Sequence, residues 1–264
     1  MARKIRQKLG AFDVFGNIVI VKFDKETALK EKKRFANKIL KGNKSITTVL
    51  EKTGKFKGRL RKQETKYVAG IKTKEAVYRE NGCVFRFNVD ETYFSPRLSN
   101  ERKEIANKIR KGECVLVLFA GVAPYSVVIA KLSKAKRIIS LEINREASKY
   151  AKLNVELNKV KDKVEIIQGD VRRAASKLKE KFDVIVMPRP QLKDTFLREA
   201  FILSKRNTRV FYYDFCKDDE IKNIVNKIKS EAKKYHKKIK ILSVKRAGEV
   251  APYKFRVRVD FKVL

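Results

Sequence analysis

The chain has 264 residues, of which 43% are hydrophobic and 36% charged. This length and composition exclude a disordered chain and suffice for one or two domains with a hydrophobic core. The net charge is +36, and it is spread along the chain, since residues 1–90 hold 24 Lys and Arg against 9 Asp and Glu and the remainder hold 42 against 21. Such an excess indicates a nucleic-acid partner, because neutralised phosphates release counterions. The alternative is a lysine-rich proteome in which the charge serves solubility.

Three cysteines, Cys83, Cys114 and Cys216, are odd in number and widely spaced. We expect them to be small core residues in a reducing compartment and not disulfides or zinc ligands. The single histidine, His236, ends a lysine-rich segment, so no His/Cys cluster for a metal can be assembled. No apolar run reaches membrane length and the basic N-terminus lacks a signal-peptide core. We therefore expect a cytoplasmic monomer that binds no metal.

Residues 1–92 are predicted to form a small α+β domain. Ala11–Phe23 has the pattern of a strand with a hairpin turn at Gly16-Asn17, and a charged helix follows over Thr27–Leu40. Ser45–Leu50 is compatible with a short strand or a helix. A small antiparallel sheet is predicted from three strands, Tyr67–Ile71, Ala76–Arg79 and Val84–Val89.

The segment Lys52–Gln63 is basic, contains two glycines and carries one aromatic residue. A solvated loop and an RNA contact are both compatible with this pattern, and the charge of the chain favours the RNA contact. The candidate RNA-binding residues are Lys55, Lys57, Arg59 and Arg61.

An α/β domain is predicted over residues 93–264. Ser95 and Pro96 are placed as N-cap and first residue of a helix over Arg97–Arg110, which Gly112 ends. Strands and helices then alternate, which requires a mostly parallel sheet covered on both faces. The predicted strands are Val115–Phe119, Arg137–Leu141, Val164–Ile167, Asp183–Met187, Arg209–Tyr213, Ile239–Val244 and Phe255–Phe261. The predicted helices are Tyr125–Leu132, Arg145–Asn158, Arg172–Lys179, Lys193–Leu203 and Glu220–Tyr235. The last two strands follow each other without a helix, so the final one should be antiparallel.

The ends of the first four strands of this domain carry polar or small residues suited to a nucleoside. Gly121 lets the backbone approach a ligand closely, and Glu142 follows twenty-one positions later, where an acid can accept from ribose hydroxyls. Asp170, after Gly169, can accept from an adenine amino group. Met187 and the rigid Pro188-Arg-Pro190 follow the fourth strand. A dinucleotide oxidoreductase is the competing interpretation, but its pyrophosphate usually requires three glycines. S-adenosyl-L-methionine, a nucleoside without phosphates, fits better.

Five stretches of the chain have the character of family motifs. They are Tyr93-Phe-Ser-Pro-Arg-Leu-Ser-Asn-Glu-Arg102, Leu118-Phe-Ala-Gly-Val-Ala-Pro-Tyr-Ser126, Glu142-Ile-Asn144, Asn154-Val-Glu-Leu-Asn-Lys-Val160 and Gly169-Asp-Val-Arg172. In these stretches, and in the strand-rich segment from Leu9 and the C-terminal Ala251-Pro252-Tyr253, the sequence resembles the archaeal and eukaryotic tRNA (guanine-37-N1)-methyltransferase family. The first stretch is specific to that family, whereas the glycine turn is shared with many class I methyltransferases.

The resemblance implies a class I Rossmann-like methyltransferase with a seven-stranded, mostly parallel sheet, preceded by a small α+β RNA-facing domain. It implies that Glu101 acts as general base and that Arg97 and Arg102 meet the carbonyl of the target base. Tyr93 and Arg61 fall at further active-site positions of the family. The cofactor positions that it implies are Phe119, Ala120, Gly121, Val122, Glu142, Ile143, Asp170, Val171 and Met187.

The sequence departs from the family pattern at several positions. Val117 stands where the family has an aspartate, and Ala123 where it has a second glycine. From the position of the family motifs in the chain we also expect it to lack the family's further N-terminal domain, which gauges the tRNA elbow. The loop after the fourth strand normally reads Asn-Leu-Pro and here reads Pro188-Arg-Pro190, and a proline side chain cannot hydrogen-bond a guanine edge. In this respect the sequence resembles an archaeal subgroup that methylates C7 of 4-demethylwyosine to isowyosine, some members also methylating N1 of guanine.

We therefore predict a tRNA methyltransferase acting on the purine at position 37 of tRNA-Phe, with Pro188 and Pro190 in its catalytic site. Isowyosine formation is the first expectation, and guanine N1 methylation, alone or in addition, is the alternative. Two further alternatives are a wyosine-pathway aminocarboxypropyltransferase and a non-enzymatic RNA-binding protein whose cofactor site has decayed.

Overall fold

The computed structural model describes residues 12–54, 56, 58–192, 194–217, 220–251 and 253–264. Residues 1–11 at the basic N-terminus and two of the candidate RNA-binding residues, Lys55 and Lys57, lie outside the described residues. The chain divides into two compact units, of which the first extends to Arg79 and resumes over Phe85–Pro96. The second unit comprises Glu80–Val84 and Arg97–Leu264. Among the helices so described, none is long and apolar enough to span a membrane.

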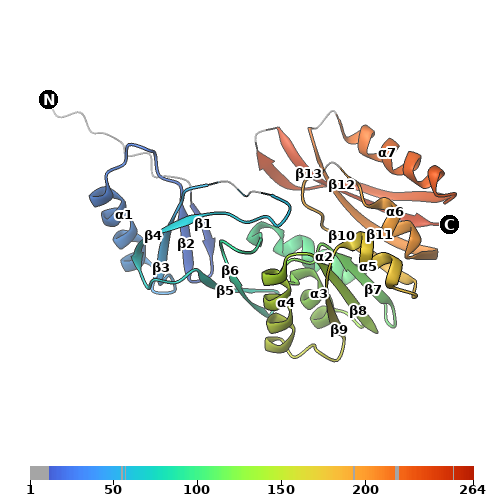
Figure 1. The fold of residues 1–264 in the computed structure, drawn as a ribbon, viewed down its shortest axis with the longest axis horizontal. Coiled ribbons are helices and arrows are strands. Elements are labelled where there is room, and N and C mark those ends of the chain that lie inside the picture. Colours follow the sequence, from blue (N-terminus) through green and yellow to red (C-terminus); the bar gives the residue numbers. More distant parts are fainter. Residues whose placement is uncertain (1–11, 55, 57, 193, 218–219, 252) are drawn as a thin grey trace. The chain divides into compact units, whose positions relative to one another are not determined.

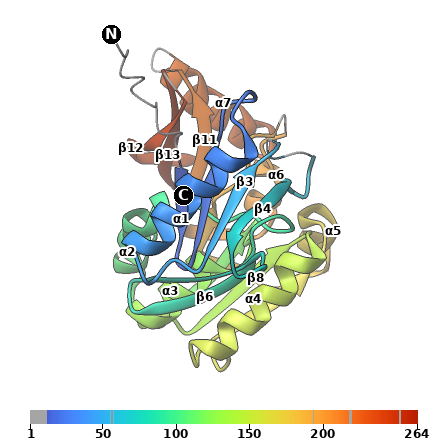
Figure 2. The same ribbon diagram turned by 90° about the vertical axis from the view of Figure 1, so that its left-hand side faces the viewer.

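The first unit is built on a four-stranded sheet of order β1-β2-β3-β4, whose strands are β1 (Phe12–Phe15), β2 (Ile18–Val21), β3 (Thr48–Lys52) and β4 (Thr65–Gly70). The hairpin predicted at Gly16-Asn17 is confirmed, because β1 and β2 pair antiparallel across it. Helix α1 (Leu29–Gly42) connects β2 to its parallel neighbour β3. It packs on one face of the sheet, as Figure 2 shows, with buried Ala36 among the valines of β2, β3 and β4.

The predicted small antiparallel sheet of three strands is wrong. β4 pairs with β3 in the four-stranded sheet, whereas β5 (Glu75–Glu80) and β6 (Cys83–Asn88) form a separate two-stranded sheet. The chain leaves the four-stranded sheet at Gly70, the last residue of β4. Gly70 has φ +91°, and a Cβ there would lie 2.1 Å from the carbonyl oxygen of Thr47. Ser45–Leu50, which the sequence left open, supplies the strand that β4 pairs with.

The second unit contains a seven-stranded sheet of order β12-β13-β11-β10-β7-β8-β9. The strands are β7 (Cys114–Leu118), β8 (Arg137–Glu142), β9 (Val164–Gln168), β10 (Phe182–Met187), β11 (Ser204–Cys216), β12 (Ile239–Ala251) and β13 (Lys254–Val263). β7 to β11 pair in parallel with one another, whereas β13 is antiparallel to both β11 and β12. The α/β prediction, including the antiparallel final strand, is confirmed. The carboxyl ends of β7 to β11 therefore meet at one edge of the sheet, which we call the carboxyl edge.

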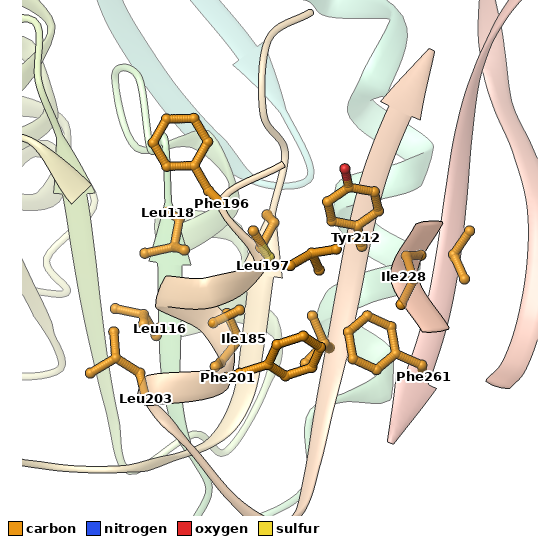
Figure 3. Packing of buried hydrophobic residues seen from close by; sticks show 14 of the residues in the cluster. Leu116, Leu118, Ile185, Phe196, Leu197, Phe201, Leu203, Tyr212, Ile228 and Phe261 are labelled. Carbon is orange, nitrogen blue, oxygen red and sulfur yellow. The ribbon is translucent and has the colours of Figure 1, made fainter. Parts of the chain in front are cut away.

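Helices cover both faces of this sheet (Figure 1). The helices α5 (Val171–Lys177), α6 (Leu197–Ile202) and α7 (Ile221–Lys234) bury apolar residues against one face. Figure 3 shows this cluster, in which Leu116 and Ile185 of adjacent strands pack against Leu197 and Phe201 of α6. The helices α3 (Pro124–Leu132) and α4 (Arg145–Leu157) lie on the other face. Residues from β7 are buried on both sides, as a central parallel strand requires.

The helix predicted over Arg97–Arg110 begins later than expected. A 3₁₀ turn, η1 (Pro96–Leu98), precedes α2 (Ser99–Lys108), and Leu98 occupies the cap position without a side-chain cap. Proline at the first position fits either kind of helix, so the sequence signal could not separate the two. As a result Glu101 and Arg102 lie in the first turn of α2, and both are buried.

Candidate active site

The turn after β7 is held in an unusual backbone conformation. Phe119, Gly121 and Ala123 all have positive φ, of 58°, 57° and 63°. Glycine adopts this region freely, whereas Phe119 and Ala123 do so at a cost that the surrounding structure must offset. The amide of Gly121 donates to Glu142 Oε2 at 2.7 Å, and Asn154, fully buried on α4, donates to the carbonyl of Val122 at 3.0 Å. These two hydrogen bonds connect the turn to β8 and to α4 and hold its conformation.

Glu142 ends β8 with its carboxylate turned toward this turn. Its second oxygen, Oε1, accepts from the amide of Asn144 at 2.7 Å. Burial raises the pKa of Glu142, and the backbone amides of Asn144 and Gly121 oppose that rise. The backbone amide of Ile143 also acts on this carboxylate, so about one of its roughly four acceptor positions stays open for a ribose hydroxyl.

The end of β9 joins the same constellation. The amide of Gly169 donates to the carbonyl of Glu142 at 2.8 Å, which ties the ends of β8 and β9 together. Asp170 caps α5 by accepting from the amide of Arg172 at 2.8 Å, and Val171 is buried behind it. The ring of Phe119 packs edge-on against Phe196 at 5.0 Å. The residues thus brought together, namely Phe119, Gly121, Glu142 and Asp170, fit a nucleoside: an open turn, a carboxylate for the sugar and a carboxylate for the base.

Glu101 lies in a buried cluster of charges on α2, β11, β12 and β13. Its Oε1 accepts from the hydroxyl of Tyr213 at 2.7 Å and from Arg258, and its Oε2 lies 3.2 Å from Nζ of Lys245. Burial raises the pKa of Tyr213 well above its ordinary value, so that its hydroxyl remains a donor. One acceptor position remains on Oε2, since a carboxylate has about four such positions.

Arg258 is the centre of this cluster. Besides Glu101 it contacts Glu104 at 2.7 Å and Asp260 at 2.6 Å, and its side chain is 1% exposed. Burial by itself would lower the pKa of Arg258, but its hydrogen bonds to Asp260 and Glu104 and the charge of Glu101 outweigh that effect and hold it above the ordinary value. A charged Arg258 is thereby fixed against the carboxylate of Glu101.

Arg102 has a different environment from the one that the family resemblance implies. Its Nε and Nη2 bind the two oxygens of Glu80 at 2.5 Å each, and both side chains are almost completely buried. The guanidinium also lies 6.0 Å from the ring centre of Tyr125. Bidentate pairing of this kind fixes geometry. The burial argues against a direct contact between Arg102 and a substrate base and favours a role in holding α2.

Two of the candidate residues meet in the first unit. The guanidinium of Arg61 lies 5.2 Å from the ring centre of Tyr93 and 5.2 Å from that of Phe56, and the two rings are 5.0 Å apart. Among the described residues, the buried Nε of Arg61 has no hydrogen-bond partner. Arg59, two positions before Arg61 in the sequence, is exposed. Arg97, in η1, belongs to the second unit and is also exposed.

The loop after β10 is organised by the residue between the two prolines. Arg189 is 2% exposed and pairs with Asp214 of β11 at 2.5 Å. It also donates to the hydroxyl of Tyr212 at 3.1 Å and to the carbonyls of Pro190, Leu192 and Asp194 at 3.1 to 3.3 Å. Pro188 and Pro190 stay half-buried on either side, next to the buried Met187 at the carboxyl edge.

Sequence reasoning did not single out Arg189, Tyr213, Asp214 or Arg258. The sequence does contain a pattern that indicates Arg258. Arg256, Arg258 and Asp260 alternate with apolar residues and therefore share one face of β13. Their partners on α2 and β11 lie far away in sequence, and only the fold brings them together. No group of three or more potential metal ligands occurs in the described part of the chain.

The fold and the carboxyl-edge constellation define a Rossmann-like, S-adenosylmethionine-dependent methyltransferase. Comparison with known families then gives the particular one. Residues 76–242 match the TRM5/TYW2 methyltransferase domain, and residues 2–73 match the TYW2 N-terminal domain. The chain belongs to the TRM5/TYW2 methyltransferase family and is an S-adenosylmethionine-dependent tRNA methyltransferase.

Individual relatives agree with this assignment. The chain is 33% identical over 255 residues to tRNA (guanine(37)-N(1))-methyltransferase Trm5b of Pyrococcus abyssi, covering 96% of this chain and 74% of the relative. The crystal structure of that Trm5b superimposes with a TM-score of 0.85 at 32% identity, over 96% of this chain and 74% of that chain. The chain is 31% identical over 306 residues to tRNA (guanine(37)-N(1))/4-demethylwyosine(37)-methyltransferase Taw22 of Nanoarchaeum equitans, over 96% of this chain and 100% of the relative. A complex of aTrm5 with tRNALeu matches with a TM-score of 0.83 at 27% identity, over 96% of this chain and 72% of that chain.

Proposed function

We propose that the chain methylates C7 of 4-demethylwyosine at position 37 of tRNA-Phe to give isowyosine. The observation that carries this proposal is the loop after β10, where Pro188 and Pro190 flank a buried Arg189. None of these three side chains offers the loop surface an amide that could read the Watson–Crick edge of guanine. In the tricyclic base that edge is closed into a largely apolar ring, so a proline surface suits it and an unpaired amide would not.

The two candidate target atoms are close to each other in their bases. C7 of 4-demethylwyosine lies near the position that N1 occupies in guanine. A single position of the methyl group of S-adenosylmethionine can therefore nearly suit both target atoms. The relative from Nanoarchaeum carries both substrates in its name, which supports a site of this kind. N1 methylation of guanine-37, alone or in addition, is therefore the second candidate, and the relative from Pyrococcus favours it.

In the proposed mechanism each group has one task. S-adenosylmethionine supplies an electrophilic methyl group when it is bound. Glu142 and Asp170 hold its nucleoside, and the open turn from Phe119 to Val122, with Ile143, Val171 and Met187 beside it, shapes the pocket. Glu101 takes the proton that methylation displaces, at its Oε2, and Arg97 steadies the carbonyl of the target base. The target base has to leave the stack of the anticodon loop to reach this edge.

The N-terminal part of the chain has a separate role in this proposal. We assign residues 1–92 to tRNA positioning and residues 93–264 to catalysis, with Arg59 and Arg61 of the first part as RNA contacts. The position of the Arg61 guanidinium over the rings of Phe56 and Tyr93 supports an RNA contact at Arg61, since a guanidinium held on aromatic rings keeps its edge available for a phosphate or a base.

A methylation assay on two matched substrates tests the proposal. One tRNA-Phe carries 4-demethylwyosine at position 37 and the other carries guanine, and the nucleoside products are identified by mass spectrometry. We expect isowyosine from the first tRNA and weak or absent 1-methylguanosine from the second. Robust transfer to guanine alone would reverse the order of the two candidates. A product heavier by an aminocarboxypropyl group would identify the transferase alternative, and failure to bind S-adenosylmethionine in a calorimetric titration would support a decayed cofactor site.

A further inference from the structure

We propose that the tip of the β12–β13 hairpin is an RNA-stacking site, in which Tyr253 receives an unpaired base beside the target nucleotide while basic residues hold the adjoining phosphates. This inference rests on the proposed function, because it requires a tRNA substrate. It assigns a role to a motif near the C-terminus that neither the cofactor constellation nor the Glu101 cluster uses.

The first observation is the exposure of an aromatic ring. Tyr253 is 83% exposed, more than any other large hydrophobic side chain among the described residues. Val250, at the same hairpin tip, is 43% exposed. Tyr253 also has φ +59°, a conformation that an aromatic residue adopts only at a cost. Within the part of the chain that the structure describes, its ring and hydroxyl contact no partner that would offset this cost.

The second observation is the position of the tip. β13 runs antiparallel to β11 in a register that places Phe255 opposite Cys216, the last residue of β11. The hairpin tip therefore lies at the carboxyl edge, where the cofactor turn and the loop after β10 also lie. Lys254 confirms the proximity, because its Nζ donates to Oε1 of Gln191 at 3.0 Å, and Gln191 directly follows Pro190.

The third observation is charge. Arg246, exposed on β12, lies over the ring of Phe255 at 4.5 Å, and Arg256 lies over Phe215 at 5.1 Å. Arg256 is buried, at 9% exposed, so the cations that a phosphate can reach at the tip are the exposed Arg246, the half-buried Lys254 and the exposed Lys217, which directly follows β11. Glu249 is the one exposed acid of the tip among the described residues.

An aromatic face among cations is the arrangement that single-stranded nucleic acid requires. Bases stack on the ring and phosphates meet the guanidinium and ammonium groups. Removing the target base from the anticodon loop breaks its stacking on the neighbouring base, and an exposed ring at the same edge can replace the stacking that is lost. A protein partner would have less use for this concentration of positive charge, so we assign the surface to RNA.

Fluorescence of a modified tRNA tests the stacking directly. The probe is full-length tRNA-Phe with 2-aminopurine substituted in turn at the two positions that flank position 37, and it is titrated with the full chain. We expect quenching at one of these positions with the wild type and with Tyr253→Phe, which keeps the ring. With Tyr253→Ala the quenching should disappear, and the dissociation constant for tRNA should rise about 5- to 100-fold. The affinity for S-adenosylmethionine should not change.

Leu242→Ala is the matched control. Leu242 is 48% exposed on the same strand, but it lies toward the amino end of β12, away from the carboxyl edge. We expect wild-type tRNA affinity and quenching from this variant. Equal affinities and equal quenching for the wild type and Tyr253→Ala would overturn the stacking site while leaving a methylating enzyme intact. Loss of quenching in Tyr253→Phe as well would overturn stacking, since the hydroxyl would then be the group required. A wild type that neither binds nor methylates tRNA would overturn this inference together with the proposed function.

Discussion

Glu101 can act as a base only through a restricted part of its carboxylate. Tyr213 and Arg258 occupy Oε1, and Lys245 approaches Oε2. These contacts fix the carboxylate in one orientation, which a positioned base requires, and they leave one acceptor position on Oε2. In the proposed mechanism Arg258 and Tyr213 therefore act through Glu101, as positioning residues for the proposed base.

We predict that Glu101→Gln slows methyl transfer about 100-fold or more, because the amide keeps the shape of the side chain and cannot accept the displaced proton. The dissociation constant for S-adenosylmethionine, measured by calorimetry, should stay at the wild-type value, since the cofactor turn is held by Glu142 and Asn154. Single-turnover rates measure the change, so that product release does not mask it.

Glu104→Gln provides the matched control for this prediction. Glu104 shares Arg258 and Lys245 with Glu101, so its removal disturbs the same charges without touching the proposed base. We expect a transfer rate within about threefold of the wild type. Equal losses in both variants would mean that Glu101 serves the charge cluster and not the chemistry.

At the scale of elements, the loop after β10, which we propose to face the target base, shows how a buried charge can hold a loop surface in place. Arg189 binds Asp214 and three backbone carbonyls of its own loop. Such a cluster restricts the loop to one conformation, since every departure from it would leave a buried charge unpaired. Pro188 and Pro190 supply the apolar surface, and Arg189 holds that surface in place.

We predict that Arg189→Leu lowers stability by about 3–5 kcal/mol, the usual cost of leaving a buried charge such as Asp214 without its partner. It should also lower kcat/KM for tRNA more than the loss of folded protein explains, because the two prolines lose their support. Thermal unfolding and initial rates at a temperature where the variant is folded measure the two effects.

Arg209→Leu is the matched control for the loop. Arg209, in the amino-terminal half of β11, pairs with Glu113 at 2.6 Å, and both side chains are 15% exposed. This variant should lose stability and keep its kcat/KM. If both variants lost kcat/KM equally, the effect of Arg189 would belong to the sheet and not to the loop.

The elements differ in how far their sequence signals predict them. The strand of Val115–Phe119 is recognisable because a central parallel strand is apolar on both faces. β12 extends to Ala251 although the sequence predicted its end at Val244. The consecutive charged residues Lys245 and Arg246 interrupt the alternation of apolar residues there, as an edge strand can tolerate. The three-stranded sheet of the first unit was wrong because strand partners are set by contacts between segments, which no single strand pattern contains.

At the scale of the whole molecule, the proposed cofactor half and the proposed proton-accepting half of the site also differ in how far the sequence predicts them. The cofactor half follows strand ends in regular order, so the sequence predicts it. The cluster around Glu101 joins residues 157 positions apart, and nothing local in the sequence links α2 to β13. The excess of positive charge follows from the composition alone. The buried ion pairs, such as Arg102 with Glu80, could be identified only from the fold.

This charge cluster makes stability depend on pH in a predictable direction. The pKa of Glu104 is lowered from 4.5 to about 2, because its hydrogen bonds to Lys245 and Arg258 and their charges outweigh the effect of burial, which by itself would raise it. The unfolded chain therefore binds a proton at Glu104 at a higher pH than the folded chain does. The stabilising contribution is complete above the unfolded pKa of 4.5 and is lost as the pH falls toward about 2.

We predict that the wild type melts higher than Glu104→Gln by roughly 2–4 °C at pH 7, for a contribution of about 1 kcal/mol after solvent screening of a side chain that is 37% exposed. At pH 3 the difference should fall to less than half, since the unfolded chain then binds a proton at Glu104 that the folded chain does not, and this proton uptake favours unfolding. Glu156→Gln is the control, because Glu156 forms a pair with Lys161 at 3.7 Å in which both side chains are largely exposed. The melting temperature of this variant should equal that of the wild type at pH 7 and at pH 3. A difference between wild type and Glu104→Gln that stays constant from pH 7 to pH 3 would show that the carboxylate contributes by shape alone.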